Sequence, residues 1–290
     1  MLNRDKKWGW FFVSPYIIGL LLFTLIPTVC ALVFSFTEYD MISLGDFVGF
    51  ENYKNVFTDP EIYTAFRNTF VFALFYLPLE IFLSCILGVA LNISFKSISF
   101  FRGLYFIPEI SPMVAVSIIW MALYNPYGGI FNYLFSLIGL GPFDYMFSNN
   151  WVVVIASIAA MTIWKGIGSQ AIYILAALQN ISDDIYEAAD IDGAGPIRKF
   201  FKITMPLLSP TLFYLIMVGV IGVMNVFEVF QIMASTTSAN VNTVATLVYN
   251  QAFVRTDMGQ ASAIAWVSFL VVGVLTLIQK KLEKRWVHYD

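Results

Sequence analysis

Six apolar blocks divide this chain, and each is long enough to cross a lipid bilayer. Their bounds are Phe11–Phe36, Asn68–Ala90, Gly103–Leu123, Trp151–Leu178, Leu207–Met233 and Ala261–Ile278. About 20 consecutive apolar residues span the ~30 Å hydrocarbon core as a helix, which satisfies its own backbone hydrogen bonds. The chain is therefore predicted to be an all-α membrane protein with six transmembrane helices, forming a single transmembrane domain over residues 1–290.

The composition excludes several other classes. Hydrophobic residues make up 59% of the chain and charged residues 12%, far from the balance of a soluble domain. Cys30 and Cys85 both fall inside apolar blocks, where they are expected to be small hydrophobic residues rather than a disulfide. The only histidine is His288, so a histidine-based metal site or catalytic triad is not expected. The net charge of -3 gives no sign of a nucleic-acid partner, and none is expected.

Lysine and arginine predict the orientation, because short cytoplasmic loops carry the excess of positive charge. With both ends inside, the cytoplasmic set is Arg4, Lys6, Lys7, Lys96, Arg102, Arg198, Lys199, Lys202, Lys280, Lys281, Lys284 and Arg285. The outer set is only Lys54, Arg67 and Arg255. The chain is predicted to be N-in and C-in, with its first block retained as a span rather than cleaved as a signal peptide. The first outer loop is acidic, with Glu38, Asp40, Asp46, Glu51, Asp59 and Glu61, and a solvated loop is favoured over a docking patch.

The stretch "EAADIDGAGPIRKFFKITMPLLSP" is hydrophilic and lies between the fourth and fifth blocks. Ser182 is a typical N-cap, followed by Asp183 and Asp184 in the first turn, and Gly193 suits the end of the helix. Pro196 is expected in the first turn of a second short helix, and Pro206 and Pro210 where the chain re-enters the bilayer. Residues 182–206 form either an amphipathic hairpin at the membrane surface or a plug for a groove on a partner.

This stretch resembles the EAA motif in the membrane subunits of binding-protein-dependent ABC importers. The matching residues are Glu187, Ala188, Ala189, Gly193, Ile203 and Pro206, with Met205 where the family usually has leucine. The segments "FVGFENY", "FRNTFVFAL", "FRGLYFIPEISP" and "MGQASAIAWVSFLVV" look like the carbohydrate branch of these permeases, the maltose and glycerol-phosphate type. The loop "ASTTSANVNT" departs from the glycine-rich sequence common there.

The resemblance implies a type I ABC importer permease in a bacterial or archaeal plasma membrane. It implies that residues 182–206 are a cytoplasmic coupling helix region, with Glu187, Ala188, Ala189, Asp192, Gly193, Ile203 and Pro206 contacting an ATPase subunit. The implied partners are a second homologous permease, two cytoplasmic ATPase subunits, an extracytoplasmic substrate-binding protein and membrane lipid. The chain has no phosphate-binding loop of the G-x-x-x-x-G-K-[ST] type, so it is not expected to be an enzyme or to hold a cofactor. ATP and Mg are expected on the partner ATPase.

Four ionisable residues fall at membrane depth, where such groups are costly and are candidates for function: Glu80, Glu109, Lys165 and Glu228. Polar residues recur at helical spacing in the fourth block, and Asn225, Glu228 and Gln231 are likewise predicted to share one helix face in the fifth. Mixed amides, carboxylates and hydroxyls suit a sugar, so the predicted substrate path is Lys165, Ser169, Gln170, Asn225, Glu228 and Gln231. Lys165 and Glu228 could instead form a structural ion pair with each other or with the partner subunit, and Glu80 and Glu109 could satisfy broken helices locally.

The leading hypothesis is a permease subunit that translocates a carbohydrate, in particular an oligosaccharide, by alternating access driven by a partner's ATP cycle. The alternative is an ion- or proton-coupled secondary transporter that uses one of the membrane-depth carboxylates. Secondary transporters usually contain inverted repeats, and the sequence shows no convincing internal repeat.

Overall fold

The computed structural model of the chain describes residues 2–43, 45–92, 98–146, 148–236 and 240–288. Lys96 of the predicted cytoplasmic set and residues 237–239 of the loop "ASTTSANVNT" lie outside these ranges. The helices are α1 (Leu2–Leu20), α2 (Ile26–Phe34), α3 (Glu51–Thr58), α4 (Pro60–Leu91), α5 (Ile98–Ile110), α6 (Met113–Leu123), α7 (Ile130–Ser136), α8 (Trp151–Gln179), α9 (Asp183–Ile191), α10 (Pro196–Lys199), α11 (Met205–Met224), α12 (Glu228–Met233), α13 (Val244–Tyr249) and α14 (Met258–Trp286). Helices thus dominate the described ranges, which confirms the all-α prediction.

The chain divides into two compact units. Unit 1 comprises Met1–Tyr63 and Leu247–Phe269, and unit 2 comprises Thr64–Thr246 and Leu270–Asp290. The predicted coupling region and all the predicted path residues belong to unit 2, so the candidate functional site lies within that unit.

Five stretches in the described ranges are long and apolar enough to cross a membrane. They are Trp8–Phe34, Pro60–Leu91, Trp151–Gln179, Pro196–Met224 and Met258–Trp286. A sixth candidate consists of α5 and α6, which are bent by 94° where they meet. The count reaches six if this bent pair is one span, so the predicted number of spans and the N-in, C-in orientation stay predictions.

The third apolar block is not the continuous helix that its sequence predicts. The helix is interrupted at Ser111, between α5 and α6, and Pro112 directly precedes α6. Proline lacks the amide hydrogen that an uninterrupted helix needs, and it disfavours helical geometry in the residue before it. Helix α5 packs on α8, whereas α6 packs on α12, so the two halves of this block contact different partners.

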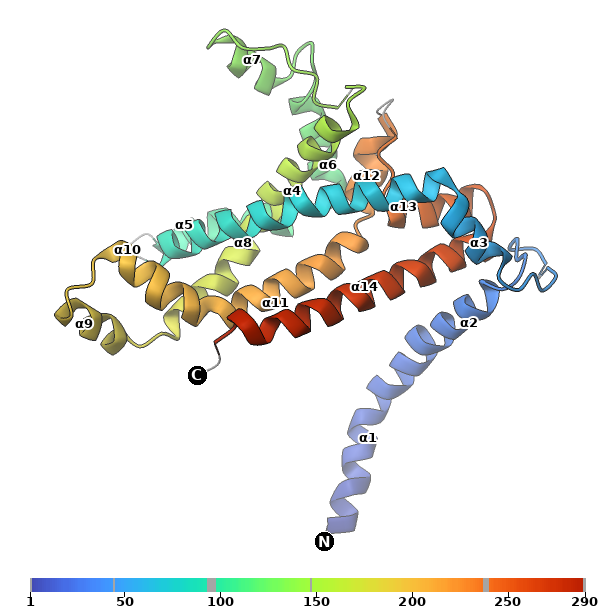
Figure 1. Ribbon diagram of the computed structural model, residues 1–290, viewed down its shortest axis with the longest axis horizontal. Coiled ribbons are helices and arrows are strands. Elements are labelled where there is room, and N and C mark those ends of the chain that lie inside the picture. Colours follow the sequence, from blue (N-terminus) through green and yellow to red (C-terminus); the bar gives the residue numbers. More distant parts are fainter. Residues whose placement is uncertain (1, 44, 93–97, 147, 237–239, 289–290) are drawn as a thin grey trace. The chain divides into compact units, whose positions relative to one another are not determined.

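Unit 2 is built around α8, which has α4 on one side and α11 on another (Figure 1). Small residues allow the close approach: a Cβ added to Gly88 of α4 would lie 2.9 Å from Ile174, and one added to Gly168 would meet the Tyr105 carbonyl of α5. The first half of α8 contributes Ile155, Ile158 and Met161 to a hydrophobic core of this unit, and Ile174 further along α8 belongs to a second cluster with Cys85 and Leu208. Glycines at helix crossings are typical of membrane bundles, where packing rather than water exclusion holds helices together.

Unit 1 is organised by Asn52 of α3, whose side-chain amide donates to the carbonyls of Ser35 and Thr37, both at 3.0 Å. The Tyr39 carbonyl accepts from the amides of Met258 and Gly259 at the start of α14. Arg255 is 2.8 Å from the Glu61 carboxylate. Most of the predicted acidic loop is exposed, but Glu61 forms an ion pair, so this acid has a local structural role.

Candidate functional site

The predicted coupling helix is α9, and both of its ends are formed as its sequence predicts. The Ser182 hydroxyl accepts from the Asp184 amide at 3.3 Å, with Asp183 and Asp184 in the first turn. At the other end, the Gly193 amide donates to the Asp190 carbonyl at 3.0 Å and the Ala194 amide donates to the Ala189 carbonyl at 2.9 Å. These two bonds form a Schellman motif, and Gly193 has the left-handed φ of 72° that it requires.

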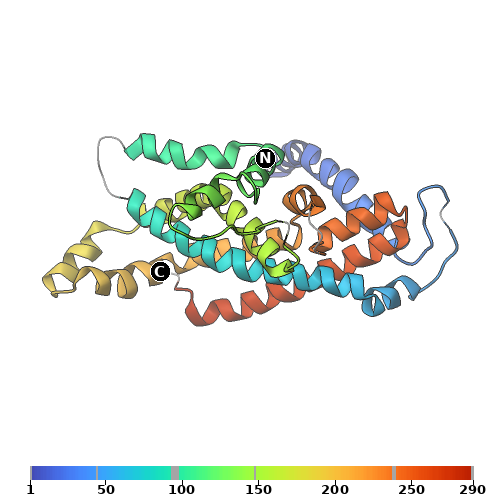
Figure 2. The same ribbon diagram turned by 90° about the horizontal axis from the view of Figure 1, so that it is seen from above.

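Helices α9 and α10 form a hairpin at the end of unit 2 where α8 ends and α11 begins (Figure 1), and a second view shows it at the same end (Figure 2). Glu187, Ala188 and Asp192 are exposed, whereas Ala189 is buried inside the hairpin. Helix α9 therefore presents an acidic outer face that includes the small Ala188, with Ile185 and Ile191 also exposed.

The second predicted helix is not a separate element, and this corrects the expectation from its prolines. Helix α10 continues through a π-helical turn at Phe200–Thr204 into α11, so that Pro196–Met224 is one helical stretch. Pro206 lies in the first turn of α11 and lacks the amide that would bond to the preceding turn. Ile203 and Pro206 are both half-buried, so they pack at the base of α11 rather than face outward.

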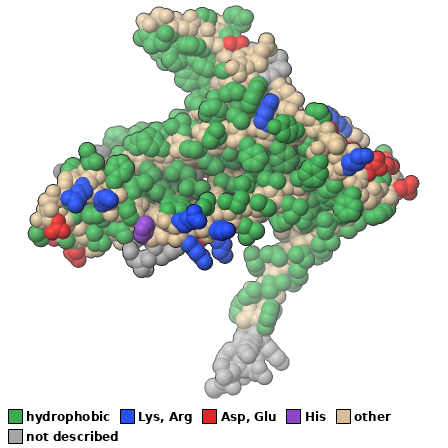
Figure 3. Space-filling model, in the orientation of Figure 1, with side chains coloured by type: hydrophobic (Ala, Val, Ile, Leu, Met, Phe, Trp, Pro, Cys, Tyr) green, Lys and Arg blue, Asp and Glu red, His purple; other side chains and the backbone are tan. Residues whose placement is uncertain are grey.

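Two contacts join α9 to this continuous helix. The hydroxyls of Tyr186 and Thr204 share a hydrogen bond at 2.9 Å. Lys199 of α10 is 2.7 Å from the Asp190 carboxylate. Lysine and arginine side chains gather over this hairpin and over the C-terminal end of α14 (Figure 3). That clustering is what the predicted cytoplasmic side of the chain requires.

Lys165 of α8 lies at the break between α5 and α6. Its ammonium donates to the Glu109 backbone carbonyl at 2.7 Å and is 4.0 Å from the Glu109 carboxylate. Only 8% of Lys165 is exposed. The helix break leaves carbonyls without their usual amide partners, and Lys165 satisfies one of them. Among the described residues, the acidic partner of Lys165 is Glu109. The suggested ion pair between Lys165 and Glu228 is therefore wrong.

Glu80 is almost completely buried, with 1% exposed, and lies between α4 and α8. Its carboxylate accepts from the Tyr76 hydroxyl at 2.7 Å and from the Gln170 amide at 3.3 Å. A Cβ added to Gly166 would lie 2.4 Å from the same carboxylate. Gln170 is thus held on Glu80, and Glu80 is satisfied locally, as the sequence allowed.

The fifth block does not carry a single polar stripe. Helix α11 ends at Met224, Asn225 caps it by donating to the Ile221 carbonyl at 2.9 Å, and Glu228 begins α12. Asn225 and Glu228 are exposed and Gln231 is half-buried. The predicted alignment of the three on one helix face is wrong, because the asparagine side chain competes for backbone bonds and interrupts the helix.

Ser169 of α8 donates to the Gly166 carbonyl at 2.9 Å.

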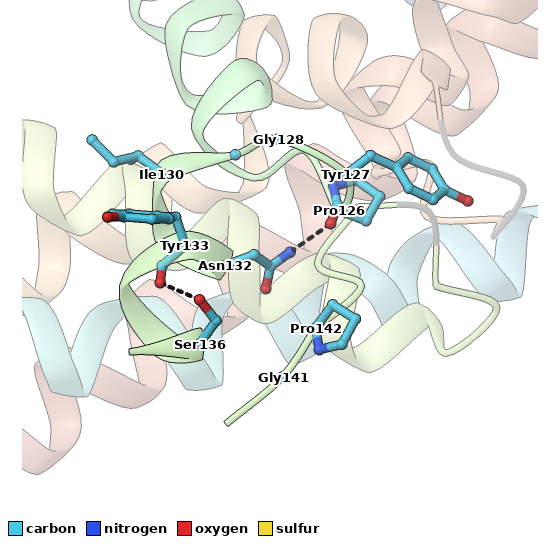
Figure 4. A pocket seen from close by; sticks show the side chains of 10 residues that line it. Pro126, Tyr127, Gly128, Ile130, Asn132, Tyr133, Ser136, Gly141 and Pro142 are labelled. Atoms are coloured by element: carbon cyan, nitrogen blue, oxygen red, sulfur yellow. Dashed lines mark hydrogen bonds between the residues drawn. The ribbon is translucent and has the colours of Figure 1, made fainter. Parts of the chain in front are cut away.

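A cavity of about 590 Å³ lies beside α7, in the connection that precedes α8 (Figure 4). The rings of Tyr127 and Tyr133 point away from each other there. The Asn132 amide donates to the Phe143 carbonyl at 2.8 Å, and its oxygen accepts from the Phe143 amide at 2.8 Å. Asn132 therefore closes this loop on itself and uses its side chain for local structure.

Residues 80–288 match the family described as "Binding-protein-dependent transport system inner membrane component". The chain belongs to this family. It is a multi-pass permease of the plasma membrane, and every predicted coupling and path residue falls within the matched region. Membership favours the ABC permease over the secondary transporter.

The permease has full-length relatives. It is 33% identical to the probable ABC transporter permease protein YesP of Bacillus subtilis, covering 100% of this chain and 94% of that protein. It is 32% identical to the multiple sugar-binding transport system permease protein MsmF of Streptococcus mutans, covering 97% of each. A chain of a bacterial ABC transporter involved in the import of the acidic polysaccharide alginate has the same fold, with a TM-score of 0.85, 22% identity and 98% coverage of both chains.

Tyr186 and Thr204 are contact residues of the permease that sequence reasoning missed. They are 18 positions apart, and no spacing rule relates them. The described residues contain no cluster of three or more histidine, cysteine or acidic side chains that could hold a metal.

Proposed function

We propose that the permease is one of two homologous membrane subunits of an ATP-driven importer for a carbohydrate, in particular an oligosaccharide. Its family is defined by dependence on a binding protein, and MsmF is named for sugar transport. Another relative is a glycerol-phosphate transport permease of Pectobacterium atrosepticum, 29% identical. The alginate importer was solved in complex with a pentasaccharide-bound periplasmic protein, which supports an extracytoplasmic binding protein as partner here.

ATP hydrolysis is assigned to two cytoplasmic ATPase subunits, which would also hold ATP and Mg, so that this chain needs no cofactor. The observation that carries this assignment is α9, a short helix capped at both ends that projects where α8 and α11 meet (Figure 1). Glu187, Ala188 and Asp192 form its accessible face, and Ala189, Gly193, Ile203 and Pro206 fix its position. Small side chains allow the close backbone approach that a docking groove needs.

The solute path is assigned to Ser169, Gln170, Asn225, Glu228 and Gln231, with Lys165 shaping it. The side chains of Asn225 and Glu228 are exposed, and their amide oxygen and carboxylate can accept from hydroxyl groups, which are donors and acceptors at once. Lys165 contributes by fixing the α5–α6 break beside α8. Alternating access would then move these groups relative to the second permease subunit.

Reconstitution tests this proposal. The permease would be purified with whatever subunits accompany it and assayed for ATPase activity in vesicles, with a binding protein and a panel of saccharides. We expect an ATPase subunit to co-purify and one saccharide to stimulate its activity. Purification without an ATPase, together with transport that follows an ion gradient and ignores ATP depletion, would overturn the proposal.

A further inference from the structure

The bond between Tyr186 and Thr204 connects two functionally different parts of the permease. Tyr186 lies in the middle of α9, the proposed docking helix, and Thr204 ends the π-helical turn at the base of α11. Thr204 is buried, with 6% exposed, and its hydroxyl oxygen is 2.9 Å from that of Tyr186. A buried hydroxyl is costly to leave without a partner, so the bond holds these two helices in one arrangement.

The chain passes from Thr204 into α11 without a break. Thr204 and Met205 both have helical backbone angles, and the stretch Pro196–Met224 is long and apolar enough to be a span. A displacement of Thr204 is therefore a displacement of the base of a membrane helix.

The covalent connection between α9 and α10 is much less restrictive. It contains Gly193 and Gly195, and no atom lies within 4 Å of a Cβ added at either position. Glycine has the widest backbone freedom of any residue, so this turn alone would let α9 swing when a partner pushed on it. The ion pair of Lys199 and Asp190 is largely solvent-exposed on the Asp190 side, and such pairs constrain little.

We propose that Tyr186 and Thr204 are positioning residues that transmit the movement of α9 to α11. This inference rests on the proposed docking of α9 to an ATPase subunit. The hydroxyl pair makes the hairpin a rigid lever, and without it the movement of α9 would be absorbed in the glycine-containing turn.

Two substitutions of Thr204 separate this role from packing. Thr204→Ser keeps the hydroxyl and loses the methyl group, whereas Thr204→Val keeps the shape and loses the hydroxyl. Tyr186→Phe removes the same bond from the other side. Tyr173→Phe is the matched control, because Tyr173 is an exposed tyrosine of α8 whose ring contacts Tyr214.

The measurement is the distance distribution between spin labels at Ile191 of α9 and Val218 of α11, both exposed. The intact complex is used, with Cys30 and Cys85 replaced by alanine, before and after trapping with ATP and vanadate. We expect one narrow distribution in both states for the parent, Thr204→Ser and Tyr173→Phe. Thr204→Val and Tyr186→Phe are expected to shift or broaden it on trapping.

Unchanged distributions in Thr204→Val and Tyr186→Phe would overturn the inference, and so would a larger effect of Thr204→Ser than of Thr204→Val. Failure of the proposed function gives a different result. In that case no ATPase subunit accompanies the parent protein, so there is no complex to trap with ATP and vanadate.

Discussion

The Lys165 ammonium lies 2.7 Å from the backbone carbonyl of Glu109, where α5 gives way to α6. A charged side chain of one helix thus stabilises the broken end of another. The first half of the broken third block, α5, packs on α8, and the second half, α6, packs on α12. Lys165 therefore contacts the third block at the junction between these two helix pairs.

Replacing Lys165 with methionine should lower the stability of the purified permease. Methionine keeps the length of the side chain but leaves the Glu109 carbonyl without its donor, and a hydrogen bond to a charged group contributes about 1.5–3 kcal/mol. The check is the thermal midpoint in detergent, with Lys202→Met as control, since Lys202 is exposed. Equal midpoints for the two variants would show that Lys165 does not support the break.

Gly168→Ala should separate α8 from α5. A Cβ at Gly168 would lie 1.9 Å from the Tyr105 carbonyl oxygen, which is backbone and cannot rotate away. Gly103→Ala on α5 is the matched control, because nothing lies within 4 Å of its Cβ and alanine favours a helix by about 1 kcal/mol. We expect a lower thermal midpoint for the first variant and an unchanged or higher one for the second. A tolerated Gly168→Ala would contradict the close crossing.

Gly193→Val should uncouple transport while the protein still inserts into the membrane. The φ of 72° at Gly193 is left-handed, and a side chain there costs about 1–2 kcal/mol, more for a β-branched residue. Gly193→Asn should be milder because asparagine tolerates this conformation. Gly195→Ala should be neutral, since its φ is -66°. Membrane content is measured by blotting and coupling by ATP-driven uptake; normal uptake in Gly193→Val would count against the docking role of α9.

The turn at Asp40 in unit 1 should loosen in acid. The amides of Ser43 and Ile42 donate to the Asp40 carboxylate at 2.7 and 3.0 Å, and these bonds hold its pKa below its ordinary value. A carboxyl whose folded pKa is lowered stabilises the turn above its unfolded pKa of about 3.9, and this stabilisation is lost as the pH falls through the folded value. Hydrogen exchange of the Ser43 amide should therefore become less protected only below about pH 4. The control is Asp40→Asn, whose protection should not follow this titration; identical profiles would refute the assignment.

Local sequence signals predicted the ends of α9 correctly. Ser182 and Gly193 act through bonds to residues only a few positions away, so their roles are visible in the sequence. Long apolar blocks likewise predicted the helical stretches. The break at Ser111 had a signal in Pro112, which the length of the block outweighed.

The contacts that define the candidate site depend on tertiary packing instead. Lys165 and Glu109 are 56 positions apart, and no spacing rule relates a lysine to a backbone carbonyl on another helix. Helical periodicity placed Asn225 and Glu228 on one face because it assumes an unbroken helix. The partnership of Tyr186 with Thr204 needed the continuity of α10 with α11, which the prolines of that stretch argued against.

The most direct test of the account is saccharide uptake by vesicles that contain the purified complex and its binding protein, with ATP supplied and ion gradients abolished. A permease that receives movement from an ATPase through α9 should take up saccharide only while ATP is hydrolysed. We expect such uptake, and its loss when ATP is removed. Uptake that continues without ATP and follows an imposed ion gradient would contradict it.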